Sequence, residues 1–380
     1  MKILPSFWTS EESSLFLNPR LPKPLQDSLE LEVHKIQLPG TLWLQSSGTE
    51  SSSSGTKIVA IHKNAFLAGA QGCVDFYKIN QSDIWFNPLP LFHVGGLAIE
   101  ARCLLSGAKS EIYQGAWSAH SFEEQIRKVQ ATWTSLVPTQ VYDLVQASIR
   151  APLSLQAVLV GGGALSAILW QQAKNLGWPL LPSYGMTETS ALIAGARLES
   201  LEHQAFLPKM ELLPHVRLEQ VENEKYLIRT RALFSGYLLK SELENPMWRP
   251  RPEPFVLDDR LVLEENKLTV LGRDSELVKI LGETVNLTEL TLSLSSVIPF
   301  PLAVVSTPHE RKGYDLHLFV EGAREGQVCL DELNGNLLPY QRIVKIHSVK
   351  TLPRTVLGKI KTTELLRLLE QRAADGFQES

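Results

Sequence analysis

Short apolar runs alternate with segments of helical periodicity between residues 57 and 182. The runs are strand-length, whereas the segments between them repeat apolar residues every three or four positions. This alternation predicts an α/β fold with mostly parallel sheets covered by helices on both faces. The predicted strands are Lys57–Ile61, Ile84–Phe86, Thr134–Val137, Ala157–Val160 and Pro179–Pro182, and the predicted helices are Gly96–Leu105, Phe122–Val129, Gln140–Ala147 and Ser166–Leu176.

The pattern changes after Pro214, where pairs of apolar runs flank polar turns. Residues 216–230 and 260–273 are predicted β-hairpins. We therefore divide the chain into a large N-terminal domain, residues 1–273, and a small α+β C-terminal domain, residues 274–380. Residues 1–40, rich in proline and polar residues, are predicted to be an irregular lead-in. In the small domain we predict helices near Leu287–Leu294, Leu330–Leu338 and Thr362–Ala373, and strands near Leu302–Val305 and Leu316–Val320.

Composition and charge exclude several classes of protein. A chain of 380 residues is too long for one ordinary hydrophobic core and fits two or more domains. Its content of 44% hydrophobic and 21% charged residues is typical of globular proteins. A net charge of −4 and a pI of about 6.2 give no sign of a surface for nucleic acid or anionic membranes. Three scattered cysteines argue against a disulfide framework or a structural zinc site. Because neither a secretion signal nor an apolar run of roughly 18 residues is evident, we expect a cytoplasmic protein.

Two loop segments next to predicted strands are candidates for binding phosphate or a planar ligand. Residues 46–56 read SSGTESSSSGT, a composition typical of a flexible linker, but they directly precede a strand, where phosphate-binding loops are common. Gly161–Ser166 follows a strand, and its three glycines leave the backbone open to close approach. An ordinary strand–helix turn with Ser166 as N-cap explains the second segment about equally well.

The segment YGMTET, Tyr184–Thr189, follows an apolar strand. Gly185 permits close backbone approach, Thr187 offers a hydroxyl, and Glu188 offers oxygen ligands that suit Mg²⁺. A strand-to-helix turn with a threonine N-cap is the alternative interpretation.

Three single residues have weaker signals. His93 follows a strand and precedes two glycines, so it is a candidate pocket wall, although a lone histidine is more often structural. Arg273 is a candidate donor to ribose hydroxyls or phosphate, with a solvated linker residue as the alternative. Lys359 follows a proline-led loop and, taken singly, is typical of a surface lysine.

The order of these segments resembles that of the adenylate-forming superfamily of acyl- and aryl-CoA ligases. YGMTET and LPRTVLGKIK (residues 352–361) carry the resemblance, which runs from about Leu42 to Leu365. Four further segments are similar to the o-succinylbenzoate-CoA ligases of menaquinone biosynthesis. They are PLPLFHVGG (88–96), SLVPTQVYDLV (135–145), SLQAVLVGGGAL (154–165) and VENEKYLIRTRALFSGYL (221–238).

The resemblance implies a two-step reaction that uses ATP, Mg²⁺ and CoA. The carboxylic acid would attack the α-phosphate of ATP and release pyrophosphate, and the CoA thiol would then displace AMP from the acyl-adenylate. The resemblance also implies that the small C-terminal domain is mobile, so that the Gly282 region enters for thioester formation. The implied partners are small molecules, without nucleic acid or membrane insertion.

The resemblance assigns roles residue by residue. Lys359 would bridge the acid carboxylate and the α-phosphate, a task for a point charge, with Thr187 and Glu188 at the α-phosphate and Mg²⁺. Asp259 would bind the ribose hydroxyls, seconded by Arg273. The other assignments are Ser47, Gly48, Thr49 and Lys57 for the β- and γ-phosphates, Gly161, Gly162, Gly163, Ala164, Ser183, Tyr184, Gly185 and Met186 for the nucleotide, and His93, Thr139 and Gly162 for the acid.

The sequence also departs from the superfamily's pattern. Seven residues separate Thr49 from Lys57, against four in SGTTGxPKG, and Glu50 would repel a triphosphate. Asp259 keeps the acid of the usual TGD without its Thr and Gly, and Ser275 replaces an Asp or Lys at the hinge. The N-terminal subdomain is truncated relative to the family, so a second copy of the chain, as a homodimer, is a candidate cover for the core.

Three hypotheses therefore stay open. The first is an o-succinylbenzoate-CoA ligase, the second a ligase for another acyl or aryl acid, and the third a degenerate relative that binds nucleotide or CoA without turnover. The joint presence of Glu188, Asp259, Arg273 and Lys359 favours catalysis, because binding alone does not need all four charges. The altered phosphate loop favours the third hypothesis.

Overall fold

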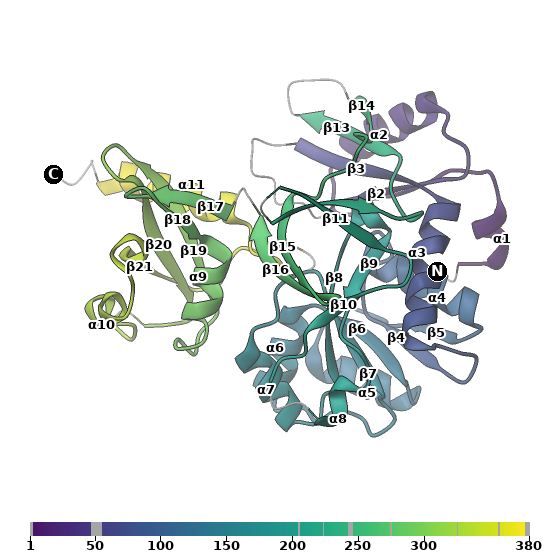
Figure 1. The fold of residues 1–380 in the computed structure, drawn as a ribbon, viewed down its shortest axis with the longest axis horizontal. Helices are drawn as coiled ribbons and strands as arrows, with labels where there is room; N and C mark the ends of the chain where they lie inside the picture. Colours follow the sequence, from purple (N-terminus) through teal and green to yellow (C-terminus); the bar gives the residue numbers. More distant parts are fainter. Residues whose placement is uncertain are drawn as a thin grey trace. The chain divides into compact units, whose positions relative to one another are not determined.

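The chain divides into two compact units. The first comprises residues 1–257 and 262–269, and the second comprises residues 258–261 and 270–380. The division at Arg273 stays a prediction. The computed structural model, drawn in Figure 1, describes residues 3–46, 55–203, 206–222, 224–241, 246–273, 276–324, 326–355 and 358–376.

A large sheet of parallel and antiparallel strands forms the centre of the first unit. Its strands are β4 (Ile84–Asn87), β5 (Lys109–Ile112), β6 (Trp133–Leu136), β7 (Ala157–Val160), β8 (Leu180–Met186), β9 (Ala191–Gly195), β10 (Met210–Leu212), β15 (Asp259–Glu264) and β16 (Lys267–Arg273). They lie in the order β15-β16-β10-β9-β8-β7-β6-β4-β5, and the residues of β15 and of β16 are each divided between the two units. Neighbours from β8 to β5 are parallel, whereas β9 is antiparallel to β8 and β10. All four residues of β7 are buried, as expected for a strand covered on both faces.

Helices cover both faces of this sheet (Figure 1). On one face, α3 (Lys63–Tyr77) and α4 (Val94–Ser106) pack against β9. On the other face lie α5 (Ala119–Lys128), α6 (Pro138–Gln146) and α7 (Ala167–Asn175), over an apolar cluster that includes Phe122, Trp170 and Trp178. Burying each such side chain contributes on the order of 2 kcal/mol to stability. The predicted α/β fold is confirmed, including the helices expected between residues 96 and 176.

A second sheet lies on the opposite side of α3. Its strands, in spatial order, are β1 (Ser14–Phe16), β2 (Thr41–Gln45), β3 (Gly55–His62), β13 (Gly236–Ser241) and β14 (Met247–Pro250). The central strand β3 is antiparallel to both of its neighbours. Its residues alternate, so that Val59 packs into the cluster shared with α3 and Ile58 packs into the cluster on the other face.

The expectation of an irregular lead-in over residues 1–40 is wrong. This segment contains α1 (Pro5–Thr9), β1 and α2 (Lys23–Ile36). Leu25, Leu29, Val33 and Ile36 recur at helical spacing and pack on the second sheet. The prolines misled the interpretation, because two of them stand at the start of α2, where a missing N–H leaves no helical hydrogen bond unmade.

The second unit is a smaller α+β fold, as predicted. In its three-stranded portion β20 lies between β19, which is antiparallel to it, and β21, which is parallel. Apolar side chains of one sheet face pack with α9, and those of the other face pack with α11. The elements are β17 (Leu277–Ile280), β18 (Glu283–Asn286), α9 (Leu287–Leu294), β19 (Leu302–His309), β20 (Gly313–Glu321), α10 (Leu330–Gly335), η3 (Pro339–Gln341), β21 (Ile343–Val349) and α11 (Thr362–Gly376).

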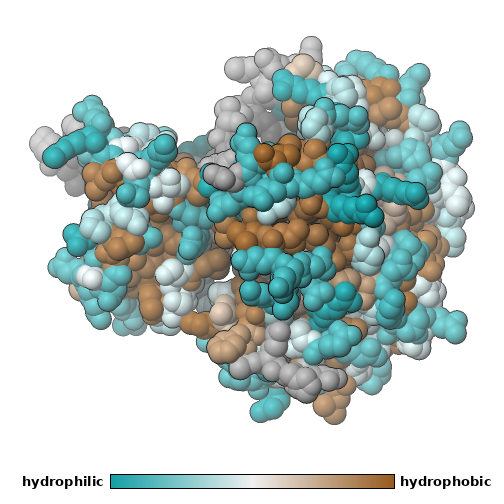
Figure 2. Space-filling view, viewed as in Figure 1, coloured by the Kyte–Doolittle hydropathy of each residue, from teal (hydrophilic) through white to brown (hydrophobic). Residues whose placement is uncertain are grey.

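The remaining elements are short. A hairpin of β11 (Arg217–Glu222) and β12 (Lys225–Arg229) confirms the one expected at residues 216–230. Two further short elements of the described residues are η1 (Thr187–Thr189) and α8 (Ser200–His203). The surface mixes hydrophilic and hydrophobic side chains, as surfaces of folded proteins commonly do (Figure 2). In the described part of the chain, no helix combines the length and the apolar character required to cross a membrane.

Candidate active site

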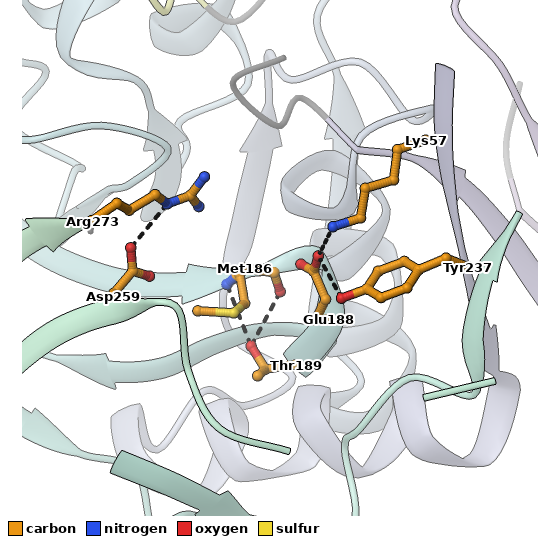
Figure 3. Close-up of polar contacts among 7 residues, drawn as sticks. All are labelled: Lys57, Met186, Glu188, Thr189, Tyr237, Asp259 and Arg273. Carbon is orange, nitrogen blue, oxygen red and sulfur yellow. Dashed lines mark hydrogen bonds and ion pairs between the residues drawn. The ribbon is translucent and has the colours of Figure 1, made fainter. Parts of the chain in front are cut away.

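Lys57, Glu188 and Tyr237 meet in the first unit (Figure 3). The Lys57 ammonium lies 2.8 Å from Glu188 Oε1 and 4.0 Å from the centroid of the Tyr237 ring. The Tyr237 hydroxyl donates to the same carboxylate oxygen at 3.3 Å. The side chain of Glu188 is 13% exposed and that of Lys57 is 37% exposed. We call these three residues the Lys57 cluster.

Strand pairing places two members of the Lys57 cluster. Lys57 on β3 is opposite Leu239 on β13, and Val59 is opposite Tyr237. Lys57 and Tyr237 are therefore diagonal neighbours on one face of the sheet, a separation that long and aromatic side chains can bridge. The predicted strand at Lys57–Ile61 is confirmed as part of β3.

Backbone contacts hold Glu188 against the segment that leads into β13. The Phe234 N–H donates to the Glu188 carbonyl at 2.9 Å, and Ser190 Oγ donates to the Ala232 carbonyl at 2.7 Å. Ser190 and Ala191 have φ values of 55° and 93°, in the region that favours glycine. The turn that carries Glu188 is thus tightly constrained before any ligand arrives.

Two glycines near the site have packing reasons of their own. A Cβ at Gly185 would lie 1.7 Å from the Ala191 carbonyl oxygen on β9, and a Cβ at Gly96 would lie 2.4 Å from the Pro90 carbonyl oxygen. Both positions exclude a side chain because neighbouring backbone is too close. Their roles toward a ligand stay predictions.

Thr187 is buried, and in the turn of residues 187–189 the Thr189 hydroxyl accepts a hydrogen bond from the Met186 N–H at 3.3 Å.

The Gly161–Ala164 loop follows β7 and adjoins β8. Gly162 has φ of 76°, so a left-handed backbone is required there. A Cβ at Gly161 would lie 3.0 Å from Ser183 Oγ, and Ser183 Oγ itself donates to the Val160 carbonyl at 3.0 Å. Ser166 accepts from the Leu169 N–H at 3.2 Å, which confirms it as the N-cap of α7. The structure thus brings the predicted glycine loop and Ser183 together.

His93 and Thr139 start two helices of the same unit. His93 is the N-cap residue of α4 and is 8% exposed, with its ring 4.5 Å from that of Phe92. Thr139 is the second residue of α6 and is half-buried. Their assignment to the acid pocket stays a prediction.

Asp259 and Arg273 form an ion pair across the ends of the β15–β16 hairpin (Figure 3). Arg273 Nε lies 2.9 Å from Asp259 Oδ1, and the side chains are 32% and 8% exposed, respectively. The Arg273 N–H also donates to Glu276 at 3.3 Å. The two residues that the sequence paired for the ribose are therefore in direct contact.

Lys359 lies in a tight turn of the second unit. The Lys359 N–H donates to Thr355 Oγ1 at 3.1 Å, and the Thr355 N–H donates to the Lys359 carbonyl at 2.7 Å. Gly358 has φ of 75°, a value that supports the turn. Arg354, which pairs with Glu321 at 3.2 Å, anchors the turn to β20. The catalytic role of Lys359 stays a prediction.

Five residues singled out in the sequence lie outside the described residues. They are Ser47, Gly48, Thr49 and Glu50 of the serine-glycine segment, and Ser275 at the hinge.

The donor set around Glu188 fits Mg²⁺ bound together with a nucleotide. Among the described residues, no group of three or more His, Cys, Asp or Glu side chains is arranged so that it could hold a metal ion by itself. Magnesium in nucleotide sites takes one or two carboxylates and completes its shell with phosphate oxygens and water. No described residue donates a hydrogen bond to Glu188 Oε2. Glu188 thus offers the single carboxylate that such a site needs.

The AMP-binding enzyme family matches residues 46–238, about half of the chain, and the chain belongs to that family. A 2-succinylbenzoate-CoA ligase of Escherichia coli K12 is 31% identical over 228 residues, which cover 59% of this chain and 46% of the relative. One of Enterococcus faecalis is 26% identical over 334 residues, covering 83% of this chain and 67% of the relative. The chain thus matches only part of each relative's length. The resemblance to adenylate-forming enzymes is confirmed.

Solved structures agree on the fold. An o-succinylbenzoate CoA synthetase of Bacillus subtilis in complex with the acyl-adenylate OSB-AMP has a TM-score of 0.69 at 23% identity, covering 85% of this chain and 68% of that one. ATP-bound MatB of Rhodopseudomonas palustris has a TM-score of 0.71 at 20% identity, covering 85% and 67%. At these identities the likeness concerns the fold alone.

Sequence reasoning missed one member of the site. Tyr237 lies in a segment quoted for its similarity, yet nothing in its local pattern marks it as a partner of Glu188, 49 positions away. The alternation of side chains along a strand was the available signal, because it puts Tyr237 and Leu239 on the same face. Only the pairing of β13 with β3 turns that into a contact with Lys57.

Proposed function

We propose that the chain is an ATP-dependent acid-CoA ligase that forms an acyl-adenylate and transfers the acyl group to CoA, releasing AMP and pyrophosphate. The observation that carries the proposal is the Lys57 cluster. It joins the lysine that ends the serine-glycine segment to the acid of YGMTET, in a member of the AMP-binding enzyme family. A cation and a metal-binding carboxylate side by side are what a metal-bound triphosphate requires.

The roles of the remaining residues follow from the resemblance. Asp259 binds the ribose hydroxyls, and Arg273 holds its carboxylate in place. Lys359 supplies positive charge to the acid carboxylate and the α-phosphate as charge develops there. Magnesium, when bound, neutralises charge on the phosphate oxygens. The Gly161–Ala164 loop and Ser183–Met186 frame the nucleotide, while His93, Thr139 and Gly162 line the acid pocket.

For the acid we propose o-succinylbenzoate. Support comes from the two relatives named as 2-succinylbenzoate-CoA ligases and from the four similar sequence segments. Small molecules are then the partners, and we expect the enzyme to act in the cytoplasm, as a monomer or with a second copy of the chain.

A second candidate is a relative that binds nucleotide or CoA without turnover. The observation that favours it is the seven-residue interval between Thr49 and Lys57, in place of four. It remains subordinate because the ion pair of Asp259 with Arg273, and that of Lys57 with Glu188, keep charges that binding alone does not require.

A pyrophosphate-release assay separates these functions. The full chain is incubated with ATP, Mg²⁺ and each of a panel of aromatic and aliphatic acids, with and without CoA. Release with o-succinylbenzoate, and formation of its CoA thioester, is the expected result. Release with a different acid alone supports another substrate. Measurable ATP binding with no release for any acid would sink the enzyme proposal.

A further inference from the structure

Lys57 has a defined resting place on Glu188. Its ammonium is held by the carboxylate at 2.8 Å and lies over the Tyr237 ring at 4.0 Å, so two side chains fix its position. A lysine over an aromatic face gains electrostatic attraction in addition to its ion pair. Both contacts of Glu188 with this pair of residues use Oε1. The carboxylate is therefore already neutralised by a protein cation.

We propose that Lys57 is a placeholder cation, whose ammonium occupies Glu188 until a metal-bound nucleotide displaces it. This inference rests on the proposed function, because it concerns the same site and the same ligand. It adds a step that the bare assignment of Lys57 to the phosphates lacks, namely the loss of the ion pair with Glu188.

Electrostatics opposes binding of a divalent cation to Glu188 while Lys57 stays paired with it. A divalent cation on Glu188 would lie only a few ångström from the ammonium, and it repels that unit charge twice as strongly as another unit charge does. The phosphates that arrive with the metal offer the ammonium a new anionic partner. The exchange therefore replaces the ion pair of Lys57 with Glu188 by two others, that of Lys57 with phosphate and that of Glu188 with the metal.

The fold allows this exchange without moving the backbone. Lys57 lies in the central strand β3, paired on one side with Leu239 of β13. Its flexible four-carbon stem carries a compact charge that can change partners. With its side chain 37% exposed, the ammonium can leave without opening a packed core. Glu188, 13% exposed and tied at its backbone to Phe234, stays in place.

The first test measures binding of Mn²⁺ alone to the full-length protein by electron paramagnetic resonance. Removing the placeholder in Lys57→Met is expected to tighten Mn²⁺ binding about two- to fivefold, the factor carried by a partly exposed ion pair. Lys240→Met is the matched control. It removes the same charge from β13, at a position opposite Thr56 and therefore on the other face of the sheet. Glu188→Gln is expected to abolish the Lys57-sensitive binding.

The second test measures ATP binding at saturating Mg²⁺ by calorimetry. Here Lys57→Met is expected to weaken binding about tenfold, because the phosphates lose their cation. Tighter binding of the metal alone together with weaker binding of the metal-bound nucleotide is expected of a lysine that changes partners. A merely structural lysine would weaken both or neither.

The outcomes separate this inference from the proposed function. Unchanged or weaker Mn²⁺ binding in Lys57→Met overturns the placeholder role, even if the wild type releases pyrophosphate. Tighter Mn²⁺ binding together with weaker ATP binding supports the role, even if no acid is turned over. If Lys57→Met does not fold, Lys57→Gln keeps a hydrogen bond to Glu188 without the charge, and the same opposite signs are expected of it. An Mn²⁺ response shared by Lys240→Met overturns the inference.

Discussion

Breaking the ion pair of Asp259 with Arg273 is expected to loosen the β15–β16 hairpin. At 2.9 Å two unit charges attract by about 6 kcal/mol if the effective dielectric constant is about 20. Desolvation of both groups and the ordering of the arginine offset most of that attraction. Asp259 is 8% exposed and Arg273 32%, a setting between an exposed pair and a buried one. We therefore expect a net coupling energy of about 1–2 kcal/mol.

A double-mutant cycle of Asp259→Asn and Arg273→Gln measures this coupling. The readout is native-state hydrogen exchange, followed by mass spectrometry on peptides from β15 and β16 of the full chain. A second cycle on the pair of Arg229 with Glu219 is the control. Its side chains are 63% and 51% exposed, so its coupling energy should be undetectable. A coupling below about 0.3 kcal/mol for Asp259 with Arg273 would refute the reasoning from burial.

Three further predictions concern catalysis, packing and pH. Lys359→Ala is expected to slow adenylate formation about 10²- to 10³-fold in a pyrophosphate assay, and an equal loss in thioester formation from preformed adenylate would contradict its assigned role. Gly185→Ala is expected to cost about 1–3 kcal/mol in urea unfolding because its Cβ would meet backbone at 1.7 Å, whereas Gly163→Ala, with 3.6 Å of clearance, should be nearly neutral. Burial lowers the pKa of His215 from 6.5 to about 4, so the folded state favours the neutral ring. The resulting stability is present above about pH 6.5 and is lost as the pH falls toward 4; melting temperatures at pH 7 and 5 should therefore differ less in His215→Gln than in wild type.

The sequence predicted those parts of the fold in which local pattern and tertiary packing agree. The helix Leu287–Leu294 and the strand Ala157–Val160 have the predicted bounds, because apolar periodicity and flanking polar residues both mark their ends. The helix at Lys23–Ile36 was missed because a segment rich in proline and polar residues was interpreted as irregular, although proline is favoured at the start of a helix. Its apolar positions had helical spacing, but their packing partners on β3 lie far along the chain.

The sequence was sufficient to predict which residues belong to the candidate site, but not which of their side chains are in contact. Glu188 could be singled out because an acid follows a strand in a recognisable segment, and Lys57 because it ends a serine-glycine segment. That the two side chains touch each other depends on which strands pair, and local pattern does not encode strand order. The glycine at 185 shows the converse. From the sequence this glycine was assigned to a ligand, yet the closeness of the Ala191 backbone is sufficient to require a glycine there.

The distances along the chain within the Lys57 cluster have a consequence for protein synthesis. Lys57 and Glu188 are 131 positions apart, and Tyr237 follows Glu188 by another 49. Contacts this distant form only after long loops have closed, so they are among the slow steps of folding. During translation, β3 emerges early and lacks its β13 neighbour until most of the first unit has been made. Until then the nascent chain has an unpaired strand edge at β3, where other chains can pair with it.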